Sequence, residues 1–597
     1  MAQLIADRRD IDFVLYEQLN ADQICKHPKF SELNRKAFDM LINEARNIAV
    51  KEILPTYSEG DREGVKFENG TVKVPECFRK VFKLFKQGEW MAMTKSPEFG
   101  GQGLPHILAQ AASEYLVGAN YAFCTYMILA SGSGKMIEMF GTETQKKLFL
   151  KNLYTGKWGG TMLLTEPQAG SDLGNLTTSA KKNSDGTYSL TGNKIFITNG
   201  EQDLTENIIH PVLARIEGAP KGTKGISLFI VPKFRVNDDG SVGERNDIVC
   251  TGVEEKMGIH ASPTCSMALG SKGKCRGLLL GAENQGMEIM FHMMNEVRLE
   301  VGTQGFAHAT TAYIHALNYA RQRLQGRDIA AGKDPDAPQV PIINHPDVRR
   351  MLLWMKAHVD GMRSLLYYVA YLFDKSVCAE DAADKERCED MIGLLTPIVK
   401  AYCSERGFDV CVQSMQIFGG YGYTREYPAE QITRDCKIAS IYEGSDGIQA
   451  MDLIGRKLGM KKGLVLVRLM NEITETVNKA KEIDLLADLA AAVESAANRM
   501  GETAMNLCQM IKSPHFRIPF SFALPFLDVM GDVLMAWMLL WRATIAAPKQ
   551  NSSPFYDGQL RTAAYFINSV LPITMGKMDA IEKGDDSVIE MDEKAFG

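Results

Sequence analysis

The chain has 597 residues, a formal net charge of −6 and 45% hydrophobic residues. A chain of this length exceeds a single hydrophobic core, so it is expected to form roughly three or four domains. The slightly acidic charge offers no basic surface for nucleic acid or for an anionic membrane. These properties favour a protein that acts on a small molecule.

The cysteine pattern and the N-terminal residues both indicate a reducing compartment. The twelve cysteines are scattered, with no CxxC pair and no Cys/His cluster at zinc spacing. They are therefore expected to be free thiols, and no metal site is predicted. The first residues, MAQLIADRRDIDFVLYEQL, are charged too early to form the apolar core of a signal peptide. We therefore expect a cytoplasmic protein.

The first two regions of the chain differ in hydrophobic periodicity. Residues 1–158 carry apolar and small residues at a spacing of three to four, most clearly over 108–140, which predicts a helical domain. Residues 159–281 instead contain short β-branched or apolar runs, such as GISLFIVPKF, separated by turn signals such as Ser184-Asp185-Gly186. The change of period predicts a small antiparallel β domain.

Helical periodicity returns after the β domain. Within 282–461, long helices are predicted over 287–322, 346–377 and 386–418, with a polar, proline-containing loop between the first two. A last block, 462–597, is also predicted to be helical. Four successive regions are thus expected.

The most hydrophobic part of the last block could be mistaken for a membrane span. Residues 520–547 are interrupted by Asp528, Asp532 and Arg542, so the longest uncharged run is far shorter than the ~20 residues that a span requires. We expect the run VLMAWMLLW, residues 533–541, to pack against the preceding long helices, because an exposed apolar patch of that size is rare on a soluble protein. No integral membrane segment is predicted.

A single carboxylate stands out within MQIFGGYGYTREYPAEQITRDCKIASIYEGSDGIQ, residues 415–449. Glu443 lies in a turn flanked by Tyr442, Gly444 and Gly447, and glycine allows a backbone to approach a ligand closely. A general base is presented to a substrate in this way. An isolated Glu-Gly pair, however, is more often an ordinary surface turn.

The surrounding residues decide between these two interpretations. Gln416, Gly419, Gly420, Arg434 and Asp435, followed by the sequence YEGS, closely resemble the C-terminal signature of the acyl-CoA dehydrogenase flavoproteins. The resemblance implies a multidomain α+β fold with an N-terminal helical domain, a central antiparallel β domain and a C-terminal four-helix bundle. The last block, an extra C-terminal helical domain, resembles the long bacterial subgroup that includes the 3-methylmercaptopropionyl-CoA dehydrogenases.

The resemblance implies FAD as the cofactor and assigns a loop of the β domain to it. The loop TMLLTEPQAGSD, residues 161–172, alone indicates only a β-turn with backbone groups that need partners. By resemblance, Met162, Leu164 and Thr165 belong to the backbone around the flavin pyrimidine edge. Ser171 corresponds to a serine that contacts ligand phosphates.

A strand that ends at Asn199-Gly200 carries two further cofactor residues by resemblance. Phe196 corresponds to an aromatic residue that lies against the isoalloxazine ring, where relatives frequently have tryptophan. Thr198 corresponds to a hydroxyl that hydrogen-bonds flavin N5. Without the resemblance, this segment would indicate only a strand with a packed aromatic side chain.

Two arginines on one predicted helix belong to different sites. Arg298 and Arg323 are 25 residues apart, roughly 37 Å along a helix axis. The resemblance implies that Arg298 lies beside the catalytic glutamate, whereas Arg323 reaches the FAD pyrophosphate of a neighbouring subunit, a task that suits its bidentate guanidinium. Gln416 and Gly420 are assigned to the same shared site, and a homodimer is therefore expected.

The remaining assignments by resemblance concern the substrate and the base. Ser171, Asn295, Arg298 and Gly444 are assigned to the acyl-CoA substrate and Ser445 to the cofactor. Asn295 replaces the acid that relatives usually carry, and no aromatic residue follows Arg323. Some relatives carry their base immediately before the first arginine, where this chain has Val297. Glu443 is therefore the predicted catalytic residue.

The implied reaction is α,β-dehydrogenation of an acyl-CoA thioester to the trans-2-enoyl-CoA, with electrons passed to an electron-transfer flavoprotein. An acyl-CoA oxidase is an alternative, since the sequence does not show oxygen access. A DNA-associated alkylation-response flavoprotein is disfavoured, because the last block is acidic rather than basic. Three aromatics, Tyr121, Phe123 and Tyr126, either line a short acyl tunnel or belong to the core.

Overall fold

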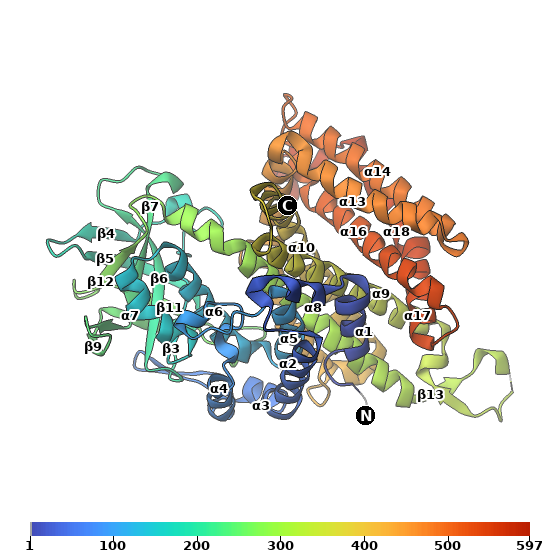
Figure 1. Cartoon of the computed structure of the whole chain (residues 1–597), viewed down its shortest axis with the longest axis horizontal. Helices are drawn as coiled ribbons and strands as arrows, with labels where there is room; N and C mark the ends of the chain where they lie inside the picture. The colour runs from blue at the N-terminus through green and yellow to red at the C-terminus, as the bar shows by residue number, and fades with distance from the viewer. Residues whose placement is uncertain (1–2, 333) are drawn as a thin grey trace. The chain divides into compact units, whose positions relative to one another are not determined.

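The computed structural model describes residues 3–332 and 334–597, which divide into two compact units (Figure 1). The sheet unit comprises Glu44–Pro105 and Ala119–Val297. The helical unit comprises Met1–Asn43, His106–Gly118 and Arg298–Gly597. Each unit is described by itself.

The sheet unit is built on an eight-stranded sheet with the order β10-β11-β5-β12-β7-β6-β3, and β4 pairs with both β5 and β6. The predicted apolar run of β7 is buried along its whole length, as expected for a central strand. The strands are β3 Trp158–Gly160, β4 Ser179–Lys182, β5 Tyr188–Thr198, β6 Asn207–Ile216, β7 Ile226–Pro232, β10 Ile248–Val253, β11 Thr264–Leu269 and β12 Arg276–Leu280.

The sheet departs in one respect from the purely antiparallel arrangement that was expected. β3 and β4 both pair with β6 in parallel, whereas the other pairs are antiparallel. Parallel neighbours need a long connection rather than a hairpin, and a long segment separates β3 from β6 in the chain. The alternation of apolar residues does not show the direction of a strand, so this feature could not be predicted.

Helices and two small hairpins complete the sheet unit. Asn120 accepts a hydrogen bond from the N–H of Phe123 and so begins α6, which explains why the predicted helix over 108–140 is divided. The elements are α3 Thr56–Glu63, α4 Cys77–Gln87, α6 Tyr121–Phe140 and α7 Glu143–Tyr154, with hairpins β1 Lys66–Glu68 with β2 Thr71–Lys73, and β8 Phe234–Val236 with β9 Val242–Arg245.

The helical unit contains the three long helices predicted from periodicity. These are α8 Gly286–Gln322, whose residues from Arg298 onward belong to this unit, α9 Pro346–Val377 and α10 Ala382–Phe418. The polar loop expected between α8 and α9 instead forms a hairpin of β13 Leu324–Arg327 and β14 Gln339–Pro341. Strands this short carry too few residues for a periodic signal.

Shorter helices surround the long ones in the helical unit. They are α1 Arg8–Asp12, α2 Arg35–Ile48, which continues into the sheet unit, α5 His106–Ala119, α11 Ala429–Lys437 and α12 Asp446–Asp452. The last block adds α13 Leu464–Lys481, α14 Ala487–Met510, α15 Ile518–Ser521, α16 Ala523–Ala546, α17 Pro554–Tyr565, α18 Leu571–Lys583 and α19 Ser587–Glu590.

Helix α16 is the core of the last block (Figure 1). It packs against α9 and α10 on one side and against α13, α14, α17 and α18 of its own block. Its run 533–540 is buried, as the sequence predicted. The segment Ala523–Lys549 is long and apolar enough to span a membrane, but 83% of its most apolar window is buried within the protein. Its apolar character is therefore accounted for by packing.

A buried set of charges joins four helices of the helical unit. This central ion network consists of Asp10, Glu114, Lys356, Asp360, Arg363 and Arg542, from α1, α5, α9 and α16. The Arg363 guanidinium lies 2.5 Å from Asp10 and 2.7 Å from Glu114. Arg542 pairs with Asp10 and donates to Ser364 and Gln559 at 2.9 and 2.8 Å. The central ion network thus contains three acidic and three basic side chains.

Candidate active site

The turn that carries Glu443 has an unusual backbone. Glu443 and Gly444 have φ values of 56° and 81°, the left-handed region, which is unfavourable for a residue with a Cβ atom. A Cβ on Gly444 would lie 2.5 Å from Nε2 of Gln449, so glycine is required there. Strain of this kind is often found at functional sites.

The turn is held by the helix that follows it. The buried amide of Gln449, in α12, donates to the carbonyl oxygens of Glu443 and Gly444 at 3.3 and 3.4 Å. Ser445, assigned to the cofactor by resemblance, occupies the N-cap position of α12 without a side-chain capping hydrogen bond. Glu443, Gly444 and Ser445 therefore lie together, as their sequence positions require.

Two cations act on the Glu443 carboxylate. Burial raises the pKa of Glu443, and the positive charges of Arg298 on α8 and Lys400 on α10 oppose this effect. Arg298 also lies 3.6 Å from Asp452, and the Lys400 ammonium lies 2.9 Å from Asp446. We call Glu443, Arg298, Lys400, Asp446 and Asp452 the Glu443 cluster. The predicted pairing of Glu443 with Arg298 is thus present as an electrostatic interaction.

The Glu443 cluster, together with Gln449, contains buried polar atoms without partners. Within the described residues, Arg298 Nε, Asp446 Oδ2 and Gln449 Oε1 are buried and have no hydrogen-bond partner. Buried polar groups are nearly always partnered in folded proteins. Three such atoms around one carboxylate therefore point to a site that completes its interactions with a ligand or with water.

Lys400 and Asp446 were not predicted from the sequence. Burial lowers the pKa of Lys400 and raises that of Asp446 to about 6, and in both cases the mutual ion pair opposes the effect. The sequence nevertheless contains a feature that could have singled out each residue. Lys400 is a single cation after the apolar run GLLTPIV, and Asp446 is an acid in the first turn of a helix.

Arg323 lies at a separate groove of the helical unit. The groove has a volume of about 430 Å³ and is open above Gly420, where a Cβ atom would meet nothing within 4 Å. Gln416 is exposed but does not line it. The lining residues are Tyr319, Arg323, Gln325, Ile342, Ile417, Phe418, Gly419, Gly420, Tyr421 and Thr424.

Aromatic side chains line this groove, although no aromatic residue immediately follows Arg323 in the sequence. Tyr319 and Phe418 are stacked with ring centroids 4.3 Å apart, and the Arg323 guanidinium lies 5.9 Å from the ring of Tyr421. A flat apolar surface beside a cation suits a nucleotide, which carries both an aromatic base and phosphate. Arg323 and Gly420 are therefore brought together as expected.

Three of the predicted flavin residues of the sheet unit, Thr165, Phe196 and Thr198, lie at or beside the end of β5. The ring of Phe196 is 60% exposed and its φ is 58°, so an aromatic side chain is held outward by an unfavourable backbone. The carbonyl of Thr165 accepts from the N–H of Ile195 at 3.0 Å, while Thr198 is half-buried. The loop at Thr165 is therefore hydrogen-bonded to the end of β5 that carries Phe196 and Thr198.

Other residues of the loop before β4 differ in exposure. Met162 and Leu164 are partly buried against the hydrophobic core of the sheet unit, and the carbonyl of Leu164 accepts from Lys194 at 2.9 Å. Ser171 is exposed. Its hydroxyl is thus accessible to a ligand, as its assignment requires.

A buried ion pair that the sequence analysis missed fixes this loop to the sheet. The Lys194 ammonium lies 2.8 Å from Glu166, whose carboxylate also accepts from Thr177 and Thr178. Burial would raise the pKa of Glu166, but Lys194 and these hydrogen bonds lower it to about 2. In the sequence, an acidic residue so soon after the apolar Met162-Leu163-Leu164 could have indicated a buried ion pair.

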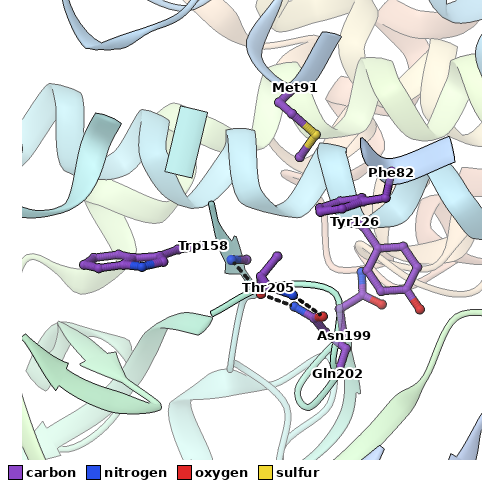
Figure 2. A pocket seen from close by; sticks show the side chains of 9 residues that line it. Phe82, Met91, Tyr126, Trp158, Asn199, Gln202 and Thr205 are labelled. Carbon is purple, nitrogen blue, oxygen red and sulfur yellow. Dashed lines mark hydrogen bonds between the residues drawn. The ribbon is translucent and has the colours of Figure 1, made fainter. Parts of the chain in front are cut away.

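The three aromatics of α6 have different surroundings. All are buried, and the Phe123 ring packs edge-on against Phe78 and Phe85, which places it in the core. Figure 2 shows Tyr126 beside a narrow cavity whose wall includes Trp158. The indole N–H of Trp158 has no partner among the described residues. For Phe123 the core interpretation therefore holds.

The position before Arg298 offers no carboxylate. Val297 is partly buried against the core of the sheet unit, and the preceding Glu296 is engaged by Lys95 at 2.7 Å and Lys135 at 3.8 Å. Asn295 is half-buried in the same stretch of α8. The residue immediately before Arg298 is therefore not a carboxylate, which leaves Glu443 as the candidate base.

Family models match nearly the whole chain. Models described as acyl-CoA dehydrogenase N-terminal, middle and C-terminal domain match residues 36–157, 161–271 and 284–459. A model described as acetyl-CoA dehydrogenase C-terminal like matches residues 469–592. The last block is thus recognised together with the other three parts.

Relatives and solved structures agree with these matches. The broad-specificity linear acyl-CoA dehydrogenase FadE5 of Mycobacterium tuberculosis is 35% identical, with 100% of both chains covered. The 3-methylmercaptopropionyl-CoA dehydrogenase of Ruegeria pomeroyi is 37% identical over 97% of this chain and 98% of that protein. An acyl-CoA dehydrogenase from Bacillus anthracis, complexed with FAD, shares the fold with a TM-score of 0.76 at 22% identity, over 95% of this chain and 90% of that one.

The predicted fold class and the resemblance to the long subgroup are both confirmed by these findings. The relatives cover the full length of the chain, the last block included. The chain belongs to the acyl-CoA dehydrogenase family of FAD-dependent oxidoreductases.

Proposed function

We propose that the chain dehydrogenates an acyl-CoA thioester between its α and β carbons, with Glu443 as the base that removes the α-proton. The surroundings of Glu443 support this most directly. Glu443 is a carboxylate on a strained turn, its pKa is raised by burial, and buried polar atoms beside it lack partners. A raised pKa suits a base that works near neutral pH.

The residues of both units fit FAD. The outward ring of Phe196 offers an apolar face for a planar heteroaromatic group, and the exposed Ser171 hydroxyl can meet a phosphate. The groove at Arg323 and Gly420 suits a nucleotide. When bound, FAD supplies the acceptor for the β-hydride.

We infer that Arg323, Gln416 and Gly420 hold the FAD of a second copy in a homodimer. Its mass by light scattering should be twice 66.2 kDa, and a monomer would contradict this.

The chain's own groups perform the remaining steps. The Glu443 carboxylate accepts the α-proton, and its backbone N–H, next to Gly444, polarises the thioester oxygen as an oxyanion-hole donor. Arg298 opposes the effect of burial, so that Glu443 stays ionised when substrate arrives. Asn295 and Ser171 are assigned to the CoA part of the substrate.

For the acyl group and the electron acceptor, we propose chemical classes rather than single compounds. The names of the two relatives specify linear acyl-CoA and 3-methylmercaptopropionyl-CoA, so unbranched thioesters are the first substrates to test, with ferrocenium as acceptor. We infer that an electron-transfer flavoprotein is the acceptor. Rapid oxygen uptake by the reduced enzyme would instead identify an acyl-CoA oxidase.

The replacement Glu443→Gln tests the proposed base. It keeps the size of the side chain but removes its basicity, so FAD and acyl-CoA should still bind while turnover falls at least ~10²- to 10⁴-fold. The matched variant Glu443→Asp keeps a carboxylate one methylene shorter and should retain more activity than the glutamine variant. Turnover of Glu443→Gln within tenfold of the wild type would refute the proposal.

A further inference from the structure

Lys400 occupies a costly position for a cation. It is fully buried in α10, and its only ion pair within the described residues is with Asp446 at 2.9 Å. Burying an ammonium group carries a penalty of several kcal/mol unless it is well paired. One Asp446 oxygen bonds to the ammonium, while the second oxygen is itself buried without a partner. Packing alone does not explain a lysine here.

The position of its partner gives Lys400 a link to the base. Asp446 is the first residue of α12, three residues after Glu443. Glu443 and Gly444 are both left-handed, and Gln449 secures their carbonyl groups from within α12. The ion pair therefore fixes the start of α12 to α10, and with it the end of the strained turn.

The Lys400 charge also acts on Glu443 directly. Lys400 and Arg298 are the two cations whose fields reach the Glu443 carboxylate. Glu405 on α10 and Lys437 on α11 act on Asp446, and Arg298 acts on Lys400. Arg298 itself faces Asp452 on α12 and Arg456, and both of these also act on the buried Lys457. Lys400 thus lies between two carboxylates and is bonded to one of them.

We propose that Lys400 is a positioning residue of the dehydrogenation, which ties the Glu443 turn to α10 through Asp446 and places a fixed positive charge beside the base. This inference rests on the proposed role of Glu443. It assigns two functions to one side chain, a mechanical one through the ion pair and an electrostatic one through its charge.

A charge series separates the two functions. In Lys400→Met the charge and the tie are both lost, so kcat should fall about tenfold and the acid limb of the kcat/KM profile should move about one unit to higher pH. In Lys400→Met/Asp446→Asn the net charge is again that of the wild type. The acid limb should return toward the wild-type position, while kcat stays low because the tie is absent.

Controls keep the inference falsifiable. Lys400→Arg preserves the charge and should keep the wild-type acid limb. If Lys400→Met does not accumulate as folded, FAD-loaded protein, Lys400→Gln carries the same expectation. A lysine needed only for folding would lower stability and leave the acid limb unmoved in every variant, and that result would overturn the proposal. An active Glu443→Gln enzyme would instead overturn the proposed function itself.

Discussion

Two buried groups of charges in the helical unit differ in how completely they are satisfied. In the central ion network, the Arg363 and Arg542 guanidinium groups and the Asp10 and Glu114 carboxylates all have partners. In the Glu443 cluster, Arg298 and Asp446 each keep a buried atom without one. Burial of charge alone therefore does not identify an active site; in the Glu443 cluster it coincides with buried polar atoms that lack partners and with a strained turn.

The pKa directions of Asp10 and Glu443 also differ, although burial raises the pKa of Asp360 within the central ion network as well. Burial would raise the pKa of Asp10, but Arg542 and Arg363 hold it well below its usual value. For Glu443 the effect of burial prevails over two nearby cations, and the pKa is raised. One carboxylate is locked in its charged form, and the other is able to exchange a proton.

Breaking the central ion network should produce the largest effect on stability. Arg363→Met removes the cation bound to Asp10 and Glu114 and leaves both carboxylates buried, so unfolding free energy should fall by about 3–5 kcal/mol. The matched variant Arg350→Met lies on the same helix but removes only exposed interactions, an ion pair with Asp347 and a contact with Tyr565, and should cost less than about 1 kcal/mol. Denaturant unfolding compares the two. Equal losses would show that the network is not structural.

As the pH falls, the enzyme should lose activity at a higher pH than the one at which the helical unit loses structure. Below the raised pKa of Glu443, the base is protonated and kcat/KM should fall about tenfold per pH unit. The Asp10 pKa is lowered, so its contribution to stability is present above its usual value of 3.8 and is lost only at lower pH. Activity should therefore disappear reversibly before far-UV circular dichroism changes. Simultaneous loss of both would contradict the distinction.

The smallest expected effect is the change in unfolding free energy caused by Glu443→Gln. Glu443→Gln removes a charge whose burial is unfavourable, so thermal unfolding should show a change within about 1 kcal/mol, toward greater stability. Glu502→Gln, at an exposed site of α14, is a control that should change stability by less than about 0.5 kcal/mol. A clear destabilisation by Glu443→Gln would mean that the carboxylate holds the fold.

The sequence predicted local elements better than long-range partners. Periodicity gave α9 with its observed bounds and α8 and α10 within a few residues, because long amphipathic helices repeat their signal many times. The β13–β14 hairpin and the parallel pairing of β3 carry no such repeated signal. The YEGS turn pointed to Glu443, but the left-handed backbone that presents it became visible only in the structure.

Partners distant in sequence were missed for a physical reason. Lys400 and Asp446 are separated by 46 residues and Arg363 and Asp10 by 353, and spacing within one element says nothing about such pairs. A single charge in an apolar helix shows that a partner must exist. It does not show which residue that partner is.

The central ion network also sets an order of events during synthesis. Asp10 bonds to Arg542, 532 residues later in the chain, so Asp10 leaves the ribosome roughly 30 to 100 s before that partner is made. The helical unit is assembled from three separate stretches of chain, and Asp10 of α1 has partners on both α9 and α16. The central ion network is therefore complete only after α16 has been synthesised.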